Sequence, residues 1–453
     1  MIRRGRLARL ATLGGLATGL LSDAAGATAH RVTHTADAAA AELHRRAARR
    51  MFAVLGEMKG LPLKAGQMLS YINEFVPSEH RGVYAEILGN LQTHTPTLPF
   101  EDVQSILAEE YQGRELADVF ASFDREPIAA ASIGQVYAAV LLDGTEVVVK
   151  VQYPGIREAM KADLANGEAL ASMISAMMPG QDLRPFIHDI MRRVEDECDY
   201  ALELQNQVDF RDRWLDHPDV VIPRAYPALS GARVLVSERL HGAEWAVMLQ
   251  TADTELKSRY GQAIFSFVFR SLFFHGMFNG DPHPGNYLFY PDGRVGFIDY
   301  GCVQRFDETQ ALAFQHLRDV VLEGSEDRVF REAIQRVFKM PRDLDPEIAA
   351  LTESYLRLVF QPVTDPQPFR FTLEYTQELL RQMVTLKNRV NIKMIRGKTA
   401  YPMDMNTADG SLVFLGRIIF GMASVLTSLE AEGDFRALLA ASWEQALVPR
   451  PAE

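Results

Sequence analysis

The sequence of 453 residues predicts an α+β fold in which a small antiparallel sheet lies between two helical regions. Two observations support this class. Residues 132–142 and 145–152 are β-branched and apolar and flank Asp143-Gly144, a dipeptide typical of two-residue hairpin turns. Residues 36–120, and the chain beyond residue 301, carry apolar residues mainly at the three- and four-residue spacing of helices.

Composition sets the broad class of the protein. With 47% hydrophobic and 23% charged residues, the chain can bury a substantial core. The formal net charge of -12 argues against nucleic acid as the main partner, because phosphate binding requires clustered lysine and arginine. Two cysteines, Cys198 and Cys302, are too few for a disulfide framework, which favours a reducing compartment.

The amino-terminal region divides into two segments. Residues 1–35 combine an arginine-rich start with an apolar run of about a dozen residues, which is too short to span a bilayer. We interpret this segment as a basic amphipathic helix that contacts a membrane surface or packs on the protein, with a secretory signal as the alternative. Residues 36–125 are predicted to form a helical extension. A helix predicted at 62–75 within this extension contains Lys64-Ala65-Gly66-Gln67.

The sheet region, residues 126–240, places a lysine inside an apolar strand. Lys150 lies in the run VVVKVQ, where a lysine is costly unless its ammonium group finds a partner. Nucleotide phosphates together with a carboxylate would supply that partner, and a lysine that points to solvent from an edge strand is the alternative. The region is completed by predicted helices at 157–178 and 183–214 and predicted strands at 220–222 and 233–237.

The last region, residues 241–453, is mainly helical. Its first long helix is predicted at 260–278, and we interpret the phenylalanines on this helix as core residues. Further helices are predicted to the end of the chain, apart from a proline-rich loop at 362–368. The apolar segment 412–429 is interrupted by an arginine and two glycines, so we expect a buried helix there and no membrane anchor.

Between residues 281 and 301, three oxygen-bearing side chains occur at a spacing typical of phosphoryl transfer. Asp281 and Asn286 form a D-x-x-x-x-N element, and a short hairpin leads from it to Asp299 in an Asp-x-Gly element. In such a site one carboxylate orients the acceptor, while an amide oxygen and a second carboxylate hold Mg²⁺ against nucleotide phosphates. The alternative is a polar loop followed by the end of a strand.

Six motifs follow one another along the chain: Lys64-x-Gly66-Gln67, AAASIGQV, VVVKVQYPG, Glu197-Cys198-Asp199-Tyr200 with Glu203, DPHPGN and FIDYG. In this order they resemble the motifs of the AarF/UbiB/ADCK family of atypical protein-kinase-like proteins. The resemblance covers about residues 50–440. It implies a bilobal protein-kinase-like fold, with a small lobe at 126–240, a helical large lobe at 241–453 and an added N-terminal helical extension that carries the K-x-G-Q motif.

The resemblance also implies roles for residues at a nucleotide site. Lys150 resembles the lysine that holds the α- and β-phosphates, and Glu203 resembles the helix carboxylate that orients this lysine. Asp281 resembles the catalytic aspartate, while Asn286 and Asp299 resemble the Mg²⁺ ligands. Two further sets are expected to contact the nucleotide, at the phosphate-covering turn and at the adenine-binding hinge: Ala129, Ala130, Ala131 and Ser132, and Glu238 with Leu240.

A separate set of residues is implied to cover the site. Lys64 and Gln67 resemble the family's K-x-G-Q pair, expected to fold over the place where a protein substrate would bind, with Glu197 and Asp199 as partners. Glu197 and Glu203 are six residues apart, so on one helix they would diverge by about 120° and serve different neighbours. Ordinary protein kinase activity is therefore less expected than ATP hydrolysis or transfer to a non-protein acceptor.

The implied activity is that of an atypical kinase or ATPase with ATP and Mg²⁺ as cofactors. The resemblance further implies support of ubiquinone or other isoprenoid-lipid metabolism beside lipid-biosynthesis enzymes, in a cytoplasmic protein attached peripherally to a membrane. Two alternatives remain open. The strings NGDPHPGN and FIDYG also resemble small-molecule phosphotransferases of the aminoglycoside and choline kinase type, and a nucleotide-binding scaffold without catalysis is the other alternative.

Overall fold

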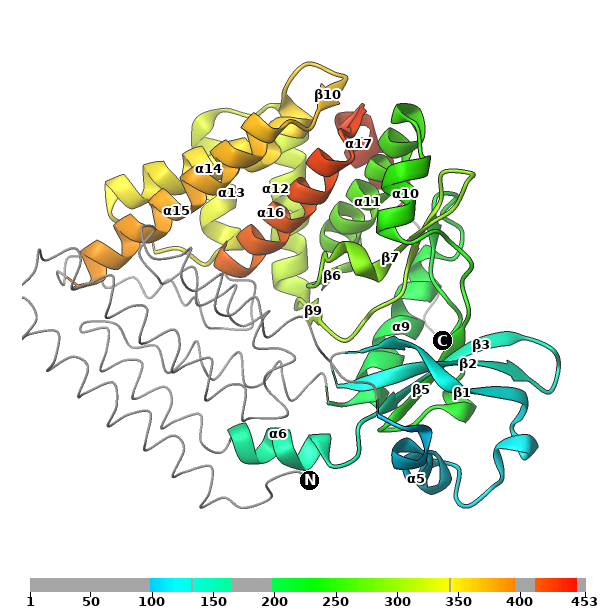
Figure 1. The fold of residues 1–453 in the computed structure, drawn as a ribbon. Coiled ribbons are helices and arrows are strands. Elements are labelled where there is room, and N and C mark those ends of the chain that lie inside the picture. The colour runs from blue at the N-terminus through cyan, green and yellow to red at the C-terminus, as the bar shows by residue number, and fades with distance from the viewer. Residues whose placement is uncertain (1–97, 132, 165–197, 342–343, 396–411, 446–453) are drawn as a thin grey trace, which may run out of the picture. The chain divides into compact units, whose positions relative to one another are not determined.

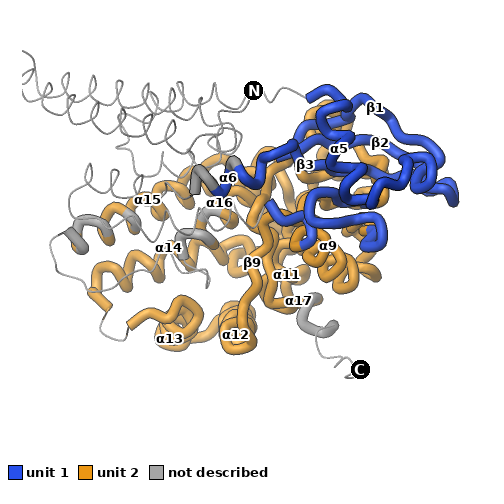
Figure 2. Tube along the Cα trace, turned by 90° about the horizontal axis from the view of Figure 1, so that it is seen from below, with its two compact units in different colours: residues 1–201, 226–237 blue, residues 202–225, 238–453 orange. Residues whose placement is uncertain are grey.

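A computed structural model of the protein describes residues 98–131, 133–164, 198–341, 344–395 and 412–445 (Figure 1). The chain divides into two compact units (Figure 2). The first unit comprises Met1–Ala201 and Tyr226–Ser237, and the second comprises Leu202–Ala225 and Glu238–Glu453. The predicted lobe boundary at residue 240 lies close to the break between Ser237 and Glu238, and Lys64, Gln67, Ser132 and Glu197 lie outside the described residues.

The first unit is built on a four-stranded sheet with the strand order β1-β2-β3-β5. The pairs β1–β2 and β2–β3 are antiparallel. Short helical elements accompany the sheet. The strands are β1 (Phe120–Ala130), β2 (Gly134–Leu141), β3 (Glu146–Gln152) and β5 (Val234–Glu238), and the helices are α5 (Phe100–Glu110), η2 (Leu116–Asp118), α6 (Ile156–Leu164) and η3 (Pro227–Leu229).

The predicted hairpin between β2 and β3 is confirmed. Gly144 has a positive φ of 88°, which a glycine adopts without steric cost, and the carboxylate of Asp143 accepts a hydrogen bond of 2.9 Å from the amide of Thr145. The valines of β3 that are buried alternate along the strand, at Val147, Val149 and Val151, and pack in one core cluster with the apolar face of α5. This alternation puts Lys150 on the other face of the sheet.

Strand β1 was not predicted. Helical structure was predicted at residues 115–120, whereas the structure has only the short turn η2 and then an eleven-residue strand. The register with β2 shifts on both sides of Pro127, and most side chains of β1 are exposed or half-buried because it is an edge strand. An irregular, mostly solvated strand lacks the apolar alternation by which strands are recognised in a sequence.

Helix α9 (Tyr200–Trp214) is shorter than the predicted helix at 183–214. Cys198 lies in a turn and Asp199 is not helical, so the prediction of one continuous helix was wrong at these two residues. The carboxylate of Asp199 accepts a hydrogen bond of 3.1 Å from the amide of Ala201, as aspartates at helix starts commonly do. The calculated divergence of Glu197 and Glu203 assumed an unbroken helix and therefore does not hold.

The described residues of the second unit are mainly helical and form three small sheets. Strand β4 is parallel to β8, which forms an antiparallel hairpin with β7, and β6 pairs with β9. The strands are β4 (Val220–Val221), β6 (Met277–Asn279), β7 (Tyr287–Phe289), β8 (Val295–Phe297), β9 (Val303–Arg305), β10 (Phe369–Arg370) and β11 (Glu432–Gly433). The helices after α9 are α10 (Trp245–Thr251), α11 (Thr254–His275), η4 (Pro284–Asn286), α12 (Glu308–Glu323), α13 (Asp327–Val337), α14 (Pro346–Thr364), α15 (Leu373–Ile395), α16 (Leu412–Ser428) and α17 (Phe435–Gln445).

Helix α11 is the centre of this unit. Its phenylalanines are core residues as expected, and the rings of Phe265 and Phe269 lie 4.3 Å apart between centroids. The predicted end at residue 278 was too late, because Gly276 adopts a left-handed conformation with φ 57° and closes the helix at His275. The chain then forms β6, which leads directly to the DPHPGN loop.

The apolar helix predicted at 412–429 is also present, as α16. Ile418, Ala423 and Leu426 on this helix are fully buried in the core of the second unit. Among the described residues, no helix is both long and apolar enough to cross a membrane.

Candidate active site

Lys150 lies on an interior strand of the first unit. Strand β3 is paired with β2 on one side and β5 on the other, so the alternative of an edge-strand lysine was wrong. Lys150 is half-buried, and its Nζ lies 5.0 Å from the centroid of the Tyr200 ring. A cation over an aromatic face is partly stabilised by the ring quadrupole, which helps to hold this ammonium group in place.

The alanine-rich turn connects β1 to β2. Ala130 pairs with Gln135 across the two strands, and the amide of Ala131 donates a hydrogen bond of 2.9 Å to the carbonyl of Gly134. The amide of Ala131 is therefore already used inside the turn. A Cβ atom on Gly134 would lie 2.2 Å from the carbonyl oxygen of Val151, so this position requires glycine.

Gln135, for which no role was predicted from the sequence, connects the chain at Leu98 to this turn. Its buried amide accepts a hydrogen bond of 2.6 Å from the backbone amide of Leu98 and donates one of 2.9 Å to the carbonyl of Leu98. It also donates to the hydroxyl of Tyr137 at 2.5 Å. A glutamine that follows Gly134 in an otherwise apolar strand was the available signal.

In the second unit, Asp281 and Asn286 are in direct contact. The Nδ2 of Asn286 donates to the carboxylate of Asp281 at 3.0 Å and to its backbone carbonyl at 3.3 Å. The loop between them is shaped by two prolines and by His283, whose Nδ1 accepts a hydrogen bond of 3.0 Å from the amide of Gly285. Because the amide nitrogen of Asn286 is directed at Asp281, its oxygen is the atom available as a metal ligand.

Asn279 connects the loop of Asp281 to the turn of Asp299. Its side-chain oxygen accepts a hydrogen bond of 3.2 Å from the amide of Asp281, and its nitrogen donates one of 2.7 Å to the carbonyl of Asp299. No role for Asn279 was predicted from the sequence. One asparagine thus sets the spacing of the two acidic segments.

Asp299 follows strand β8 and lies next to Asn286. The amide of Ile298 donates to the carbonyl of Asn286 at 3.1 Å, and the carboxylate of Asp299 accepts a hydrogen bond of 3.0 Å from the amide of Gly301. The hairpin therefore brings Asn286 and Asp299 to one edge, as expected.

Magnesium fits this pair of oxygen ligands. In the described part of the chain, no group of three or more histidine, cysteine, aspartate or glutamate residues could hold a metal by itself. Magnesium is commonly bound by one or two protein oxygens together with substrate phosphates and water, which matches one carboxylate and one amide.

Helix α9 carries Glu203 and is joined to the Asp299 turn by side chains within the second unit. Glu203 is 4% exposed and lies three residues before Asn206, on the same face of the helix. The Nδ2 of Asn206 donates to the carbonyl of Tyr300 at 3.1 Å, and its oxygen accepts a hydrogen bond of 2.8 Å from Arg305. Arg305 also forms an ion pair of 2.6 Å with Asp209 of the same helix.

Two tyrosines beside these acids stay protonated. Burial, and secondarily the charge of Asp299, raises the pKa of Tyr300 well above its ordinary value. Burial, and secondarily Asp281, likewise raises the pKa of Tyr287. The hydroxyl of Tyr300 donates to the carbonyl of Phe297 at 2.9 Å, so it supports the turn.

The expected hinge residues lie at the start of the second unit. The amide of Glu238 donates to the carbonyl of Arg224 at 2.8 Å, and its carboxylate accepts a hydrogen bond of 3.0 Å from the amide of Arg224. Leu240 packs against the backbone at Gly296, where an added Cβ would lie 3.0 Å from its side chain. Of the expected adenine contacts, the amide of Glu238 is thus already engaged.

Of the expected covering residues, only Asp199 is described. Its carboxylate lies 3.5 Å from the guanidinium of Arg157 on α6, with both side chains partly exposed. This ion pair gives Asp199 a partner within the first unit.

An acid-amide-acid cluster after a helix, combined with a lysine on an interior strand of a small sheet, is typical of kinase-like α+β proteins. The comparison with known families agrees. The chain belongs to the ABC1 atypical kinase-like family, whose model matches residues 90–332, more than half of the chain. This confirms the family resemblance inferred from the six motifs.

Related proteins carry kinase names. The chain is 28% identical over 350 residues to the atypical kinase COQ8, mitochondrial, of Saccharomyces cerevisiae, covering 76% of this chain and 67% of the relative. It is 29% identical to the AarF domain-containing protein kinase 1 of Xenopus laevis, covering 64% and 56%. The chain spans about half the length of several curated relatives that it matches.

A solved structure has a similar fold. It is the complex of Rv3197 with erythromycin from Mycobacterium tuberculosis, which has 29% sequence identity and a TM-score of 0.58. The match covers 89% of this chain and 97% of that chain. The mixed helix and sheet architecture of this chain is therefore similar to that of this solved structure.

Proposed function

We propose that this protein binds MgATP and either hydrolyses it or transfers its terminal phosphoryl group to a non-protein acceptor. The observation that carries the proposal is the hydrogen-bonded cluster in the second unit, where Asn279 and Asn286 hold the segments of Asp281 and Asp299 together. The cluster combines a carboxylate for orienting an acceptor with two oxygen ligands for a hard cation.

Each residue has a distinct part in this proposal. Asn286 and Asp299 would hold Mg²⁺, which would supply positive charge against the phosphates when bound. Asp281 would accept a hydrogen bond from the acceptor hydroxyl or water and keep it oriented. Lys150, with its ammonium over the Tyr200 ring, would neutralise phosphate charge, and Glu203 would orient the lysine.

The alanine-rich turn between β1 and β2 is expected to limit how many backbone amides of the first unit can bind nucleotide phosphates. Because the amide of Ala131 is bonded to the carbonyl of Gly134, this amide is engaged inside the turn and is not free for a phosphate. We propose that Ala130 sets nucleotide preference by its side chain, so that Ala130→Gly should change the ratio of ATP to ADP affinity. An unchanged ratio in calorimetric titrations would remove this idea.

The biological setting is also proposed from the family. Support of ubiquinone or other isoprenoid-lipid metabolism, peripheral membrane contact and partnership with lipid-biosynthesis enzymes follow from the resemblance, and one relative is named as a mitochondrial atypical kinase. Covering of the protein-substrate side by Lys64 and Gln67 belongs to the same proposal. If it is correct, the protein should not phosphorylate peptides, and Lys64→Ala should increase such activity.

The decisive experiment measures ATP turnover by the purified protein with and without vesicles that contain anionic lipid. Asp299→Asn should lower turnover by about 100-fold or more while circular dichroism shows an unchanged fold. Asp292→Asn is the matched control, because Asp292 lies in the exposed turn of the β7–β8 hairpin and bonds only its neighbour Arg294 among the described residues.

The outcomes separate the three candidate functions. Phosphate released from ATP and abolished in Asp299→Asn supports the proposal. Stoichiometric transfer to a soluble alcohol would indicate a small-molecule phosphotransferase. Binding of ATP without formation of ADP, with and without lipid, would indicate a scaffold.

A further inference from the structure

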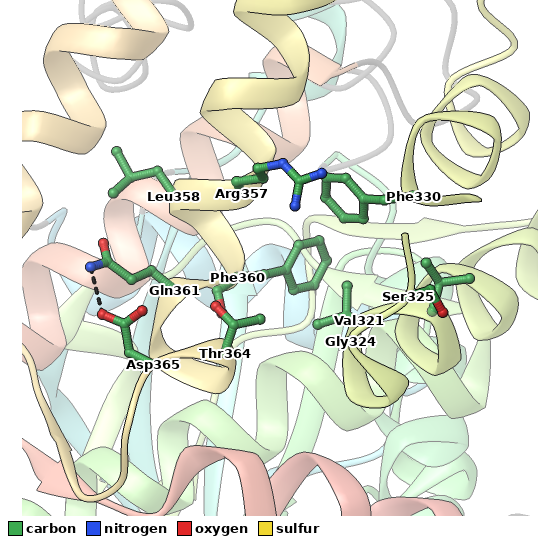
Figure 3. A pocket seen from close by; sticks show the side chains of 11 residues that line it. Val321, Gly324, Ser325, Phe330, Arg357, Leu358, Phe360, Gln361, Thr364 and Asp365 are labelled. Atoms are coloured by element: carbon green, nitrogen blue, oxygen red, sulfur yellow. Dashed lines mark hydrogen bonds between the residues drawn. The ribbon is translucent and has the colours of Figure 1, made fainter. Parts of the chain in front are cut away.

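A pocket of about 380 Å³ lies in the helical part of the second unit, apart from the residues discussed above. It is formed by the ends of α12 and α14 and by the first part of α13 (Figure 3). This volume lies within the range of about 300–1,000 Å³ that is typical of sites for small molecules.

The inner wall of the pocket is apolar. Val321, Phe330 and Phe360 are nearly fully buried and line it. Figure 3 shows the two phenylalanine rings on neighbouring helices, with the ring of Phe360 between the ends of α12 and α14. Aromatic walls of this kind suit a ring or a short hydrocarbon group, because the transfer of such a group out of water lowers the free energy.

The rim of the pocket is electronegative. Helices α12 and α14 both end there, and neither has a basic residue in its last turn. Arg436 of α17 bonds the carbonyl of Leu322 in the last turn of α12, so the partial negative charge at the end of α14 is the one that faces the rim without a cation from its own helix. Asp365 caps α14 at this end and adds a full negative charge. Its carboxylate accepts a hydrogen bond of 2.7 Å from the neutral amide of Gln361 and, in the part of the chain that the structure describes, forms no ion pair.

The cation that lines the pocket is already neutralised. The guanidinium of Arg357 lies 4.5 Å from the ring centroid of Phe330 and bonds Asp327 at 2.7 Å and Glu353 at 3.0 Å. The carboxylate of Glu353 also forms an ion pair with Arg331, with 2.9 Å between Nε and the carboxylate oxygen. The guanidinium groups of Arg357 and Arg331 therefore balance the charges of two carboxylates, and neither of these ion pairs includes Asp365.

We propose that this pocket binds a small amphipathic cation, with an apolar group against Phe360 and an ammonium group at the rim beside Asp365. The apolar wall accounts for the first part and the surplus negative charge for the second. An amphipathic anion would instead place its charge against Asp365 and the C-terminus of α14, so the rim favours a positively charged ligand over a negatively charged one.

The test measures binding of three compounds of the same shape to the full chain: 3-phenylpropylammonium, 3-phenylpropanol and 3-phenylpropionate. Ligand-observed saturation-transfer NMR gives the affinities directly and does not depend on nucleotide turnover. The ammonium compound should bind most tightly and the carboxylate least. Equal or tighter binding of the carboxylate, or no binding of the ammonium compound at millimolar concentration, would overturn the proposal.

Two variants separate the parts of the site. Asp365→Asn keeps the size of the side chain and should weaken the ammonium compound by about three- to tenfold, while changing the alcohol by less than about twofold. Thr364→Trp, at an exposed position of the lining, should fill the pocket and weaken both compounds. Affinities that are unchanged in both variants, in proteins with normal thermal melting, would show that the compounds bind elsewhere.

Discussion

The connection between α9 and the Asp299 turn can be tested by replacing Asn206 with leucine. Asn206 is 3% exposed and uses both ends of its amide, toward the carbonyl of Tyr300 at 3.1 Å and toward Arg305 at 2.8 Å. Leucine has the same number and branching of side-chain heavy atoms as asparagine, so it leaves no cavity. It leaves the Tyr300 carbonyl without this donor inside the protein, which costs about 1–3 kcal/mol.

The free-energy cost of losing the hydrogen bond between the side-chain oxygen of Asn206 and Arg305 is smaller. Arg305 is 43% exposed and keeps its ion pair of 2.6 Å with Asp209, so water and Asp209 replace most of the lost bond. The free energy of unfolding should therefore fall by about 2 kcal/mol in total. Urea unfolding followed by fluorescence measures this change.

Gln207→Leu is the matched control. Gln207 is 1% exposed on the same helix and donates to the carbonyl of Pro223 at 2.9 Å, so its loss should cost a similar free energy without touching the Asp299 turn. Binding of ATP with Mg²⁺ and with a chelator then separates the two variants. Asn206→Leu should reduce the gain in affinity from Mg²⁺ by about three- to tenfold, and Gln207→Leu should not. Equal Mg²⁺ dependence in the two variants would refute this reasoning.

The remaining predictions concern stability, and urea unfolding measures each. Gly134→Ala should cost about 3 kcal/mol, because its Cβ would lie 2.2 Å from a backbone oxygen and push β2 and β3 apart; an unchanged midpoint would contradict this. Asp253→Ala should cost about 1 kcal/mol, because its carboxylate caps α11 through a bond of 2.8 Å to Leu256. Burial lowers the pKa of His217 from 6.5 to about 4, so the unfolded chain binds more protons between these values. Stability should fall as the pH drops through this window, and His217→Asn should show a smaller fall.

Local chemistry made several elements predictable. The hairpins at Asp143-Gly144 and Asp292-Gly293 were readable because glycines with positive φ and aspartates that bond their own turn are needed there. Helix α16 was readable because its apolar run is long. In each case the determining contacts lie within a few residues along the chain.

Other elements depended on distant contacts. Strand β1 forms because it pairs with β2, despite a charged and proline-containing sequence. Helix α9 starts at Tyr200 and not earlier, where Asp199 bonds the helix start and pairs with Arg157. A periodicity read along one segment contains no information about these partners.

The sequence by itself determined the family of this protein and the candidate residues Lys150, Asp281, Asn286 and Asp299, because their types and spacing are required by the chemistry of phosphate and magnesium. Only the tertiary structure decided that Lys150 is on an interior strand. It also revealed the positioning roles of Asn279 and of the Asn206–Arg305 connection, as well as the pocket at the ends of α12 and α14. The physical reason is that hydrogen bonds and cavities join groups that are far apart in sequence, and packing alone determines which of these groups meet.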